Sequence, residues 1–494
     1  MRTSIPVLPL ALLTVLACAD DSPAEPRLPA SVAVTPSSVL LESFGEEAGL
    51  TAEVFDAAGR RLDAPIVWTS SAGEVAPVDS GGRVVAVLNG QASILATAGA
   101  ASGTAEVTVA QRTASITWRS DPVVFDAVGE STGIIADAKD ARGHSIPGWW
   151  GVYSSEDVGV VTVNGDGVVR SVDSGRTVLA IALDGVSAVL PAEVRAGEWA
   201  PRPAAGLARS DAAAATVALD GRLYVLGGLS GAGSGSPVAA VERFDPSTDS
   251  WSALAPLPLP TWGSAAVAHA GKLYLFGGFT SADPFPFGPT DRAFSYDPAL
   301  DQWSEIAPLP SARGGAGAES SGGLVHVLGG SAAGVTDDHS VYDPAADAWS
   351  AGPLLPTART AFASAALPGG LILVAGGRGS PADDIGLASV DLYDPATGAW
   401  SAAAPLPAPR FGLASAAAGG SIYVLGGTPT TDVFSRVLAY RPAQDAWAQM
   451  ADLREPLTLL GAAPLADGIH VVGGASEASA GERTANHWIF VPPG

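Results

Sequence analysis

Cysteine and lysine are nearly absent from this chain of 494 residues. It contains one cysteine, Cys18, and two lysines, Lys139 and Lys272. A single cysteine excludes intrachain disulfides, and it excludes thiol chemistry in the rest of the chain. Acidic residues number 50 against 26 basic ones, so the formal charge is −24. This charge argues against binding to nucleic acid or to anionic lipid by electrostatic attraction.

Charged residues are sparse as well. They make up 15% of the chain, whereas 59 glycines and 39 prolines divide it into short segments. This composition favours many short strands joined by turns over long helices, and no stretch resembles a helical solenoid or a coiled coil. The chain is too long for one hydrophobic core, so several domains are expected.

The N-terminus has the features of a secretory signal. Arg2 precedes an apolar stretch, residues 5–17, which is too short to span a bilayer as an ordinary helix. Ala17 directly before Cys18 resembles the lipobox of bacterial lipoproteins, and this resemblance implies that Cys18 is lipidated and becomes the mature N-terminus. We expect a signal peptide at 1–17 and a lipidated N-terminus with a polar tether at 18–29. The alternative is an ordinary secretory signal with a chance cysteine.

Residues 30–110 are predicted to form a β-sandwich. About seven short segments alternate apolar and polar side chains, with Gly, Asp and Pro between them. The motifs resemble bacterial Ig-like domains of group 2. The matching residues are Val32-x-Val34-x-Pro36, Asp56-x-x-Gly59, Trp68-x-Ser70-Ser71, Val75-Ala76-x-Val78-Asp79-x-x-Gly82 and Gly90-x-Ala92-x-Ile94.

A second, more divergent copy of this sandwich is expected at 112–196. Asp140-x-x-Gly143 repeats the turn of the first copy, and Tyr153-Ser154-Ser155 repeats its Trp-Ser-Ser region. In the family such domains occur in surface proteins as spacers and adhesive modules. The resemblance therefore implies that the two sandwiches form a stalk.

Six Gly-Gly doublets, each closing a short apolar segment, recur through the C-terminal half. Their first glycines are separated by 50, 52, 47, 50 and 47 residues, a period that indicates a repeat architecture. An aromatic residue follows each of the first five doublets by about fifteen residues, and a tryptophan follows that aromatic by seven. These pairs are Phe244 and Trp251, Tyr296 and Trp303, Tyr342 and Trp349, Tyr393 and Trp400, and Tyr440 and Trp447.

This spacing resembles the kelch repeat, whose fold is a β-propeller with one four-stranded blade per repeat. The sixth repeat ends at Gly494 before its tryptophan, whereas Trp199 precedes the first doublet at the matching distance. We predict that residues near 197–201 supply the outer strand of the last blade and close a propeller over 197–494. The predicted fold is all-β, with two Ig-like β-sandwiches followed by a six-bladed kelch-type β-propeller.

Arginine recurs ten residues after the tryptophan, just before the innermost strand of the next blade. It stands at Arg209, Arg313, Arg359 and Arg410, with Thr261 and Leu457 at the two remaining positions. The kelch resemblance implies that this position and the loops after the doublets, where Arg378 lies, open on one ligand-binding face. These five arginines are predicted to bind a carboxylate, sulfate or uronate by bidentate bonds. The alternative is that they bond loop carbonyls and acidic residues within the scaffold.

Signs of metal or catalytic chemistry are few. The loop pairs Asp337-Asp338 and Asp383-Asp384 offer oxygen ligands for Ca²⁺, but such pairs are usually solvated, so no metal site and no cofactor are predicted. The six histidines lack metal-ligand spacing, and packing explains His326 and His470, which stand in mid-strand. Kelch copper oxidases acting on galactose need a tyrosine–cysteine crosslink, and the absence of cysteine from the propeller excludes that chemistry.

Three functions fit these features. The first is a lipoprotein of the bacterial cell envelope or surface whose propeller binds a glycan or protein partner without catalysis, carried on the Ig-like stalk. Ala19 rather than aspartate follows Cys18, so the outer membrane is the expected location if the protein is not simply secreted. The alternative is a secreted or surface carbohydrate-active enzyme of the cofactor-independent epimerase or lyase type. The third is a structural envelope protein that contacts its neighbours, since fold alone does not select a function.

Overall fold

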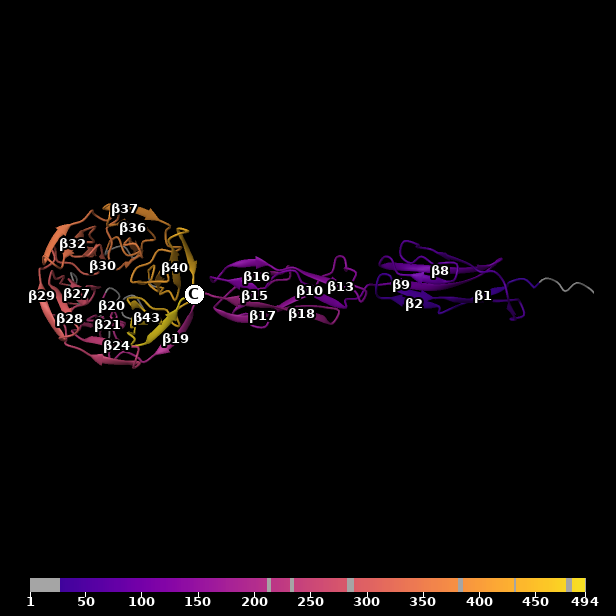
Figure 1. The fold of residues 1–494 in the computed structure, drawn as a ribbon, viewed down its shortest axis with the longest axis horizontal. Coiled ribbons are helices and arrows are strands. Elements are labelled where there is room, and N and C mark those ends of the chain that lie inside the picture. Colours follow the sequence, from indigo (N-terminus) through magenta and orange to yellow (C-terminus); the bar gives the residue numbers. More distant parts are fainter. Residues whose placement is uncertain are drawn as a thin grey trace, which may run out of the picture. The chain divides into compact units, whose positions relative to one another are not determined.

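The computed structural model describes residues 27–210, 215–231, 235–281, 288–380, 385–430, 432–476 and 482–493. These residues form strands and turns without an α-helix, which confirms the all-β prediction (Figure 1). The same residues accordingly contain no helix of the length and apolarity needed to cross a membrane. The predicted signal peptide and Cys18 lie outside the described residues, and their assignment stays a prediction.

The first sandwich is built from strands β1 to β9. Its largest sheet has the order β2-β9-β8-β6, and smaller sheets pair β1-β4-β5 and β3-β7. Alternate residues of β8, among them Ile94, are buried against Val84 and Val107, as expected for a strand with one face in a core. The strands are β1 (Ser31–Thr35), β2 (Ser38–Leu41), β3 (Glu47–Gly49), β4 (Thr51–Phe55), β5 (Arg61–Leu62), β6 (Val67–Ser70), β7 (Arg83–Val85), β8 (Gly90–Ala98) and β9 (Ala101–Val109).

The second sandwich repeats this plan with strands β10 to β18. Its sheets have the orders β11-β18-β17-β14, β12-β16-β15 and β10-β13. Val161, Val169 and Leu179 are fully buried in its core. The strands are β10 (Ser115–Trp118), β11 (Val123–Phe125), β12 (Ser131–Gly133), β13 (Ala136–Lys139), β14 (Val152–Ser155), β15 (Val161–Val163), β16 (Val168–Ser171), β17 (Gly175–Leu183) and β18 (Val186–Val194).

Six four-stranded antiparallel sheets form the blades of a propeller, as predicted. Figure 1 shows the blades in a ring, with strands such as β20 and β30 near its centre and β29 and β37 at its rim. A two-residue ribbon, β22 (Leu229–Ser230) with β23 (Ser236–Pro237), extends blade 1. From the centre outward the strands are: blade 1, β20 (Thr216–Leu219), β21 (Arg222–Leu226), β24 (Val241–Asp245), β25 (Ser250–Ala253); blade 2, β26 (Ala265–His269), β27 (Lys272–Phe276), β28 (Ala293–Asp297), β29 (Gln302–Ile306); blade 3, β30 (Gly317–Ser321), β31 (Leu324–Leu328), β32 (His339–Asp343), β33 (Ala348–Ala351); blade 4, β34 (Ala363–Ala366), β35 (Ile372–Ala375), β36 (Val390–Asp394), β37 (Ala399–Ala403); blade 5, β38 (Ala414–Ala418), β39 (Ser421–Leu425), β40 (Val437–Arg441), β41 (Ala446–Gln449); and blade 6, β42 (Gly461–Leu465), β43 (Gly468–Val472), β44 (His487–Val491), β19 (Glu198–Arg202).

Blade 6 is closed by a strand from the other end of the propeller sequence. β19 pairs antiparallel with β44, and Trp199 lies opposite Phe490, so the predicted exchange is confirmed. The Trp199 ring packs 5.0 Å from the Phe490 ring, and its indole N–H donates to the Ala451 carbonyl at 3.0 Å. Gly197 precedes the strand at φ +89°, and a Cβ there would lie 2.2 Å from Phe490 Cζ. Only glycine fits this entry to the closing strand.

Tryptophans of the outer strands join neighbouring blades. Each indole N–H donates to a carbonyl in the segment that leaves the outer strand of the preceding blade, and each indole packs 4.9 to 5.3 Å from the aromatic residue seven positions earlier. The bonds run from Trp251 to Pro203, Trp303 to Ala255, Trp349 to Ala307, Trp400 to Pro353 and Trp447 to Ala404, at 2.8 to 3.2 Å. Tryptophan therefore contributes both apolar area and a directional bond between blades.

Three blades add a carboxylate to this junction. In blade 3, Asp347 accepts the Tyr342 hydroxyl at 2.6 Å and the Ala307 backbone N–H of the preceding segment at 2.9 Å. These bonds hold the pKa of Asp347 below its usual value, with the tyrosine bond as the largest cause. Asp347 also has a φ of +48°, in the left-handed region. Asp301 and Asp445 repeat the arrangement, whereas blade 4 has Gly398 at this position.

Replacing Asp347 is expected to separate its two contributions. Asp347→Gly removes both bonds but keeps the left-handed backbone, and we expect a loss of about 2 kcal/mol in the free energy of unfolding. Asp347→Ala should lose about 1 kcal/mol more, because alanine is strained at positive φ. Urea denaturation measures both, with Asp343→Ala as a control whose carboxylate bonds only within its own turn. Equal stability of all three variants and the wild type would contradict this account.

Candidate functional site: the central channel and the doublet face

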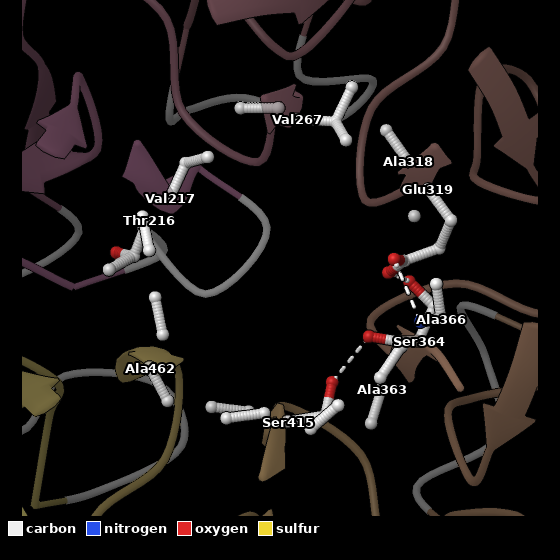
Figure 2. Close-up of a pocket in the computed structure, with 18 of the residues that line it drawn as sticks. Thr216, Val217, Val267, Ala318, Glu319, Ala363, Ser364, Ala366, Ser415 and Ala462 are labelled. Carbon is white, nitrogen blue, oxygen red and sulfur yellow. Dashed lines mark hydrogen bonds between the residues drawn. The ribbon is translucent and has the colours of Figure 1, made fainter. Parts of the chain in front are cut away.

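The innermost strands of the six blades surround a cavity of about 300 Å³ (Figure 2). These strands are rich in alanine, serine and other small residues, which allows them to approach one another closely. Among the described residues that line this channel, Glu319 of β30 is the one ionisable side chain. None of the arginines predicted to bind a ligand belongs to this lining.

The channel wall also presents backbone groups. Each innermost strand is the edge of its sheet, and every second residue of an edge strand turns its N–H and C=O away from its partner strand. In blade 4 the Ala366 N–H donates to Glu319 Oε2 at 3.0 Å, and the Ser364 carbonyl accepts the Ser415 hydroxyl of blade 5 at 2.6 Å. In the described lining, polarity therefore arises from strand edges, serine and threonine hydroxyls and one carboxyl group.

Glu319 reaches from blade 3 to blade 4. Its Oε1 accepts the Ser364 hydroxyl at 2.8 Å, and its Oε2 accepts the Ala366 N–H. Figure 2 shows the carboxyl group beside Ser364, with Thr216 and Val217 on the opposite side of the cavity. The side chain is half-buried. Burial raises the pKa of Glu319 to about 7, against the two hydrogen bonds, which favour the charged form.

Six equivalent β-bridges define one face of the propeller, which we call the doublet face. Each bridge joins the residue after an arginine position to the residue after the Gly-Gly doublet of the same blade. The bridged pairs are Ser210 and Leu229, Trp262 and Phe279, Gly314 and Ser331, Thr360 and Arg378, Phe411 and Thr428, and Thr458 and Ala475. The repetition shows that all six arginine positions lie on the same side of the ring.

Backbone hydrogen bonds link these positions around the ring. The second glycine of each doublet donates to the carbonyl at the arginine position of the next blade, at 2.9 Å in all six cases, including the closing bond from Gly474 to Arg209. Thr261 and Leu457 accept the same bond as the arginines, because the contact uses only the main chain. The doublets therefore hold neighbouring blades together as well as turning the chain.

A second chain of bonds forms a collar at the doublet-face end of the innermost strands. Gly315 N–H donates to Gly263 C=O, and Ala361, Gly412 and Leu459 continue the series from blade to blade at 2.6 to 3.0 Å. All five residues have positive φ, between 52° and 65°. Glycine is favoured there, and Gly263, Gly315 and Gly412 were the signal in the sequence that would have revealed this collar.

Four of the five predicted ligand-binding arginines are buried inside their own blades. Arg209, Arg313, Arg359 and Arg410 are 0 to 1% exposed. Arg209 Nη1 donates to the Gly227 carbonyl at 2.9 Å, and its Nη2 pairs with Glu242. Arg359 donates to the carbonyls of Gly376 and Ser389, both at 3.1 Å, and pairs with Asp391 at 2.5 Å. Arg313 donates to the hydroxyls of Ser311 and Ser340 at 2.8 and 2.9 Å.

These partners occupy one equivalent position. Glu242, Ser340 and Asp391 are each the second residue of the third strand in their blades, and blade 5 has Leu438 there. Arg410 accordingly donates to the Gly426 carbonyl at 3.2 Å and lies 4.6 Å from the Phe434 ring, while its Nε and Nη2 lack a hydrogen-bond partner among the described residues. Burial lowers the pKa of Arg410 to about 10, with nearby Arg436 adding to the effect. This geometry favours the scaffold alternative for the four arginines.

Arg378 is the candidate arginine that solvent reaches. It is half-buried on the doublet face and its guanidinium carbon lies 3.9 Å from the Phe411 ring centroid. Asp337 and Asp338 are half-buried, and Asp338 accepts the Ser311 hydroxyl at 3.1 Å. Asp383-Asp384 lie outside the described residues. Within the described parts of the chain, no group of three or more His, Cys, Asp or Glu side chains is placed to hold a metal ion.

Four histidines form two buried pairs that the sequence interpretation missed. His326 Nδ1 contacts His339 Nε2 at 2.9 Å in blade 3, and His470 contacts His487 in the same way at 2.8 Å in blade 6. His326 and His339 pack on Tyr393 of the next blade, so the pair lies at a blade interface. Burial, followed by the neighbouring histidine, lowers the pKa of His339 to about 4 and that of His487 to about 3.

The two histidine pairs should make the propeller sensitive to acid. Between the unfolded pKa near 6.5 and the lowered folded values, the unfolded chain binds protons that the folded chain does not, so stability falls as the pH falls through this window. The loss should reach on the order of 3 kcal/mol for each pair. A variant with His326→Leu and His339→Val, the residues that blade 4 has there, should show a shallower fall between pH 7.5 and 4.5 in denaturant titrations. An unchanged pH slope would contradict this assignment.

Comparisons with known proteins agree with this architecture. The family model of the KLHDC2/KLHL20/DRC7 Kelch-repeats domain matches residues 188–377, the Kelch motif matches 359–407, and the bacterial Ig-like domain of group 2 matches 30–109. Kelch-like protein 35 of Mus musculus is 32% identical over 152 residues, which are 23% of this chain and 26% of that protein. Beta-scruin of Limulus polyphemus is 35% identical over 118 residues, 24% of this chain and 13% of that protein.

A longer alignment at lower identity covers almost half of the chain. Kelch-like protein terF of Aspergillus terreus is 28% identical over 242 residues, which are 47% of this chain and 51% of that protein. The chain therefore spans between about an eighth and a half of these relatives. The solved structure of YjhT aligns with 59% of this chain and 97% of its own length, at 16% identity and a TM-score of 0.48. Residues 30–109 match the bacterial Ig-like domain of group 2, and the six blades form a β-propeller of the kelch type.

Proposed function

We propose that the propeller is a non-catalytic binding module that takes a protein partner on its doublet face. The observation that carries this proposal is the ring of six equivalent inter-blade hydrogen bonds, which fixes every arginine position and every doublet in one rigid frame. Such a frame holds the described residues that flank the doublets in defined positions, as a recognition surface requires. In this proposal the Ig-like domains connect the module to an N-terminal lipid anchor in the bacterial envelope.

A protein partner is favoured over an acidic glycan because of where the arginines lie. Binding a carboxylate or sulfate by bidentate bonds needs guanidinium groups that the ligand can reach. Four of the five candidates are almost completely buried and bond to groups of their own blades. Arg378, stacked on Phe411, is the cation of this set that a partner can contact.

The enzymatic alternative receives no comparable support. A cofactor-independent epimerase or lyase of the expected kind needs an acid or base and an arginine facing one substrate. Glu319 faces the channel, whereas the described lining of the channel contains no arginine. The described geometry therefore favours a binding module over this alternative.

Site-specific crosslinking tests the proposed face. A chain of residues 20–494 contains no cysteine, so Arg378→Cys introduces a single attachment point for a crosslinker on the doublet face. Arg222→Cys is the matched control, because Arg222 is also half-exposed and lies at the opposite end of β21 from the doublet. Both proteins are incubated with envelope extract from the native host. A discrete protein adduct with Arg378→Cys alone supports the proposal, and equal adducts or none with both variants overturn it.

The anchor has its own test. Cys18→Ser should move the full chain from the membrane fraction to the soluble fraction, because an acyl chain on Cys18 supplies the membrane affinity. Retention of this variant in the membrane fraction would overturn the lipid anchor. The result does not affect the proposal for the doublet face.

A further inference from the structure

We propose that the central channel of the propeller binds a small ligand through a primary ammonium group that pairs with the carboxylate of Glu319. The site lies inside the ring, among the innermost strands, and does not depend on the protein partner proposed for the doublet face. Four observations lead to it: the position of Glu319, its remaining acceptor capacity, the absence of a cation in the described lining, and the size and chemistry of the cavity.

Glu319 stands where the other blades have apolar residues. It pairs across the sheet with His326, and the positions with the same register in the other inner strands hold valine or alanine. Those residues are Val217, Val267, Ala365, Ala416 and Ala463. Five of the six blades have no carboxyl group at this position, so packing of the inner strands does not require one. Glu319 is therefore an addition to the repeat and not a part of it.

The carboxylate keeps room for further hydrogen bonds. Each of its oxygens accepts one bond from the protein, Oε1 from Ser364 and Oε2 from Ala366, and each carboxylate oxygen has two acceptor positions. An ammonium group has three donors and carries the charge that the carboxylate needs. No cationic side chain belongs to the described lining, so none of these lining residues supplies such a partner.

The cavity has the size and the surface for a small amphipathic amine. A volume of about 300 Å³ is many times the roughly 10–15 Å³ that a single water requires, so a small organic molecule fits. Val217 and Val267 provide apolar contacts for an alkyl group, and the Ser364 hydroxyl and the Ala366 N–H lie next to the Glu319 carboxylate. A monoamine with a short alkyl chain matches this division better than an anion, which the carboxylate would repel.

A purely structural role for Glu319 makes a different prediction. Its two bonds join β30 to β34, so the side chain could serve only to connect blades 3 and 4. In that case Glu319→Gln would change the melting temperature without any ligand being involved. The ammonium site instead requires saturable binding that depends on the charge of the probe and on the charge of residue 319.

Calorimetric titration with n-butylamine at pH 8 tests the proposal, with n-butanol as the neutral probe of the same length. We expect one n-butylamine per chain, no saturable binding of n-butanol, and at least a tenfold weaker affinity for n-butylamine in Glu319→Gln. Glu305→Gln, which removes an exposed carboxylate from an outer strand, is the matched control and should bind like the wild type. The full chain is used throughout.

The pH dependence provides a second readout that does not require a variant. Affinity should fall about tenfold per pH unit below the pKa of Glu319, which lies at about 7, because only the carboxylate pairs with the ammonium group. The titratable groups on the packed strands are His269 of β26, whose Nδ1 contacts the Ser320 hydroxyl at 2.8 Å, and His326 of β31; β34 has none. A His269→Gln chain should keep the same profile.

Two results overturn the proposal. One is the absence of saturable n-butylamine binding, or equal binding of n-butylamine and n-butanol, by the wild-type chain. The other is binding that stays within a factor of two in Glu319→Gln or between pH 8 and pH 5.5. If Glu319→Gln does not fold, the probe comparison and the pH profile of the wild type still decide the question. Loss of the crosslink at Arg378 would leave all of these results unchanged.

Discussion

Removal of residues 197–203 is expected to lower the melting temperature of the propeller sharply. These residues contain β19, which supplies the outer strand of blade 6 and all its hydrogen bonds to β44. Without it, β44 becomes an exposed edge, and the Trp199 bond to blade 5 is lost. Calorimetry should compare the chain of residues 20–494 with the same chain lacking 197–203. A chain that starts at residue 204 is not suitable, because it lacks both sandwiches as well as β19. An unchanged melting curve would contradict closure by β19.

A point substitution isolates the main contact of the closing strand. Trp199 is 8% exposed, and Trp199→Ala should cost about 3–5 kcal/mol in the free energy of unfolding, as expected for a buried aromatic side chain. Trp150→Ala is the control, since Trp150 is 76% exposed and should change stability by less than about 0.5 kcal/mol. Denaturant titration of the two variants gives the comparison. Similar values for both would mean that Trp199 does not secure the ring.

The buried pair of Arg359 and Asp391 should show strong coupling. Replacing either residue by leucine leaves the other charge buried without its partner, and each single change should cost about 3–5 kcal/mol. Burial already lowers the pKa of Arg359 and raises that of Asp391, which indicates that desolvation acts against both charges. The double variant should therefore cost about 2–3 kcal/mol less than the sum of the single changes. Blade 5, with Leu438 opposite Arg410, shows that leucine fits at this position.

A surface pair provides the control for this cycle. Arg222 and Asp245 also form an ion pair, at 2.9 Å, but their side chains are 40% and 21% exposed. Coupling in that cycle should be much weaker than in the cycle of the buried pair, because solvent screens the charges. Additive effects in the Arg359 and Asp391 cycle would contradict the assignment of this arginine to the scaffold.

The sequence predicted the fold and the closing strand because their signals are local. The spacing from the doublet to the aromatic residue and on to the tryptophan repeats along the sequence. The sixth repeat has no tryptophan of its own, and Trp199 before the first repeat shows that the outer strand of blade 6 comes from there. Asp301, Asp347 and Asp445 also recur in the sequence, five residues after the aromatic residue of their blades. Their left-handed backbone and their bond to the preceding blade depend on tertiary structure and are not visible in the sequence.

The candidate site was harder to predict because it depends on contacts between blades. The sequence indicated the positions of Arg209, Arg313, Arg359 and Arg410, but not the direction of their side chains, which is set by acceptors on the third strand of the same blade. In the sequence, Glu319 is one of 50 acidic residues and no motif distinguishes it. Glu319 lines the channel because β30 is the innermost strand of blade 3. That strand becomes part of a channel wall only when the six blades close into a ring.

A glycan array carrying neutral, sulfated, uronate and sialylated sugars tests the central claim most directly. The claim is that the four buried arginines belong to the scaffold and that recognition is of a protein at the doublet face. The wild-type chain of residues 20–494 and a folded variant with Arg359→Leu and Asp391→Leu are applied side by side. We expect that no acidic glycan binds the wild-type chain and fails to bind the variant. Binding of acidic glycans by the wild type, abolished in the variant while its melting curve stays cooperative, would contradict the claim and make the arginine positions the site.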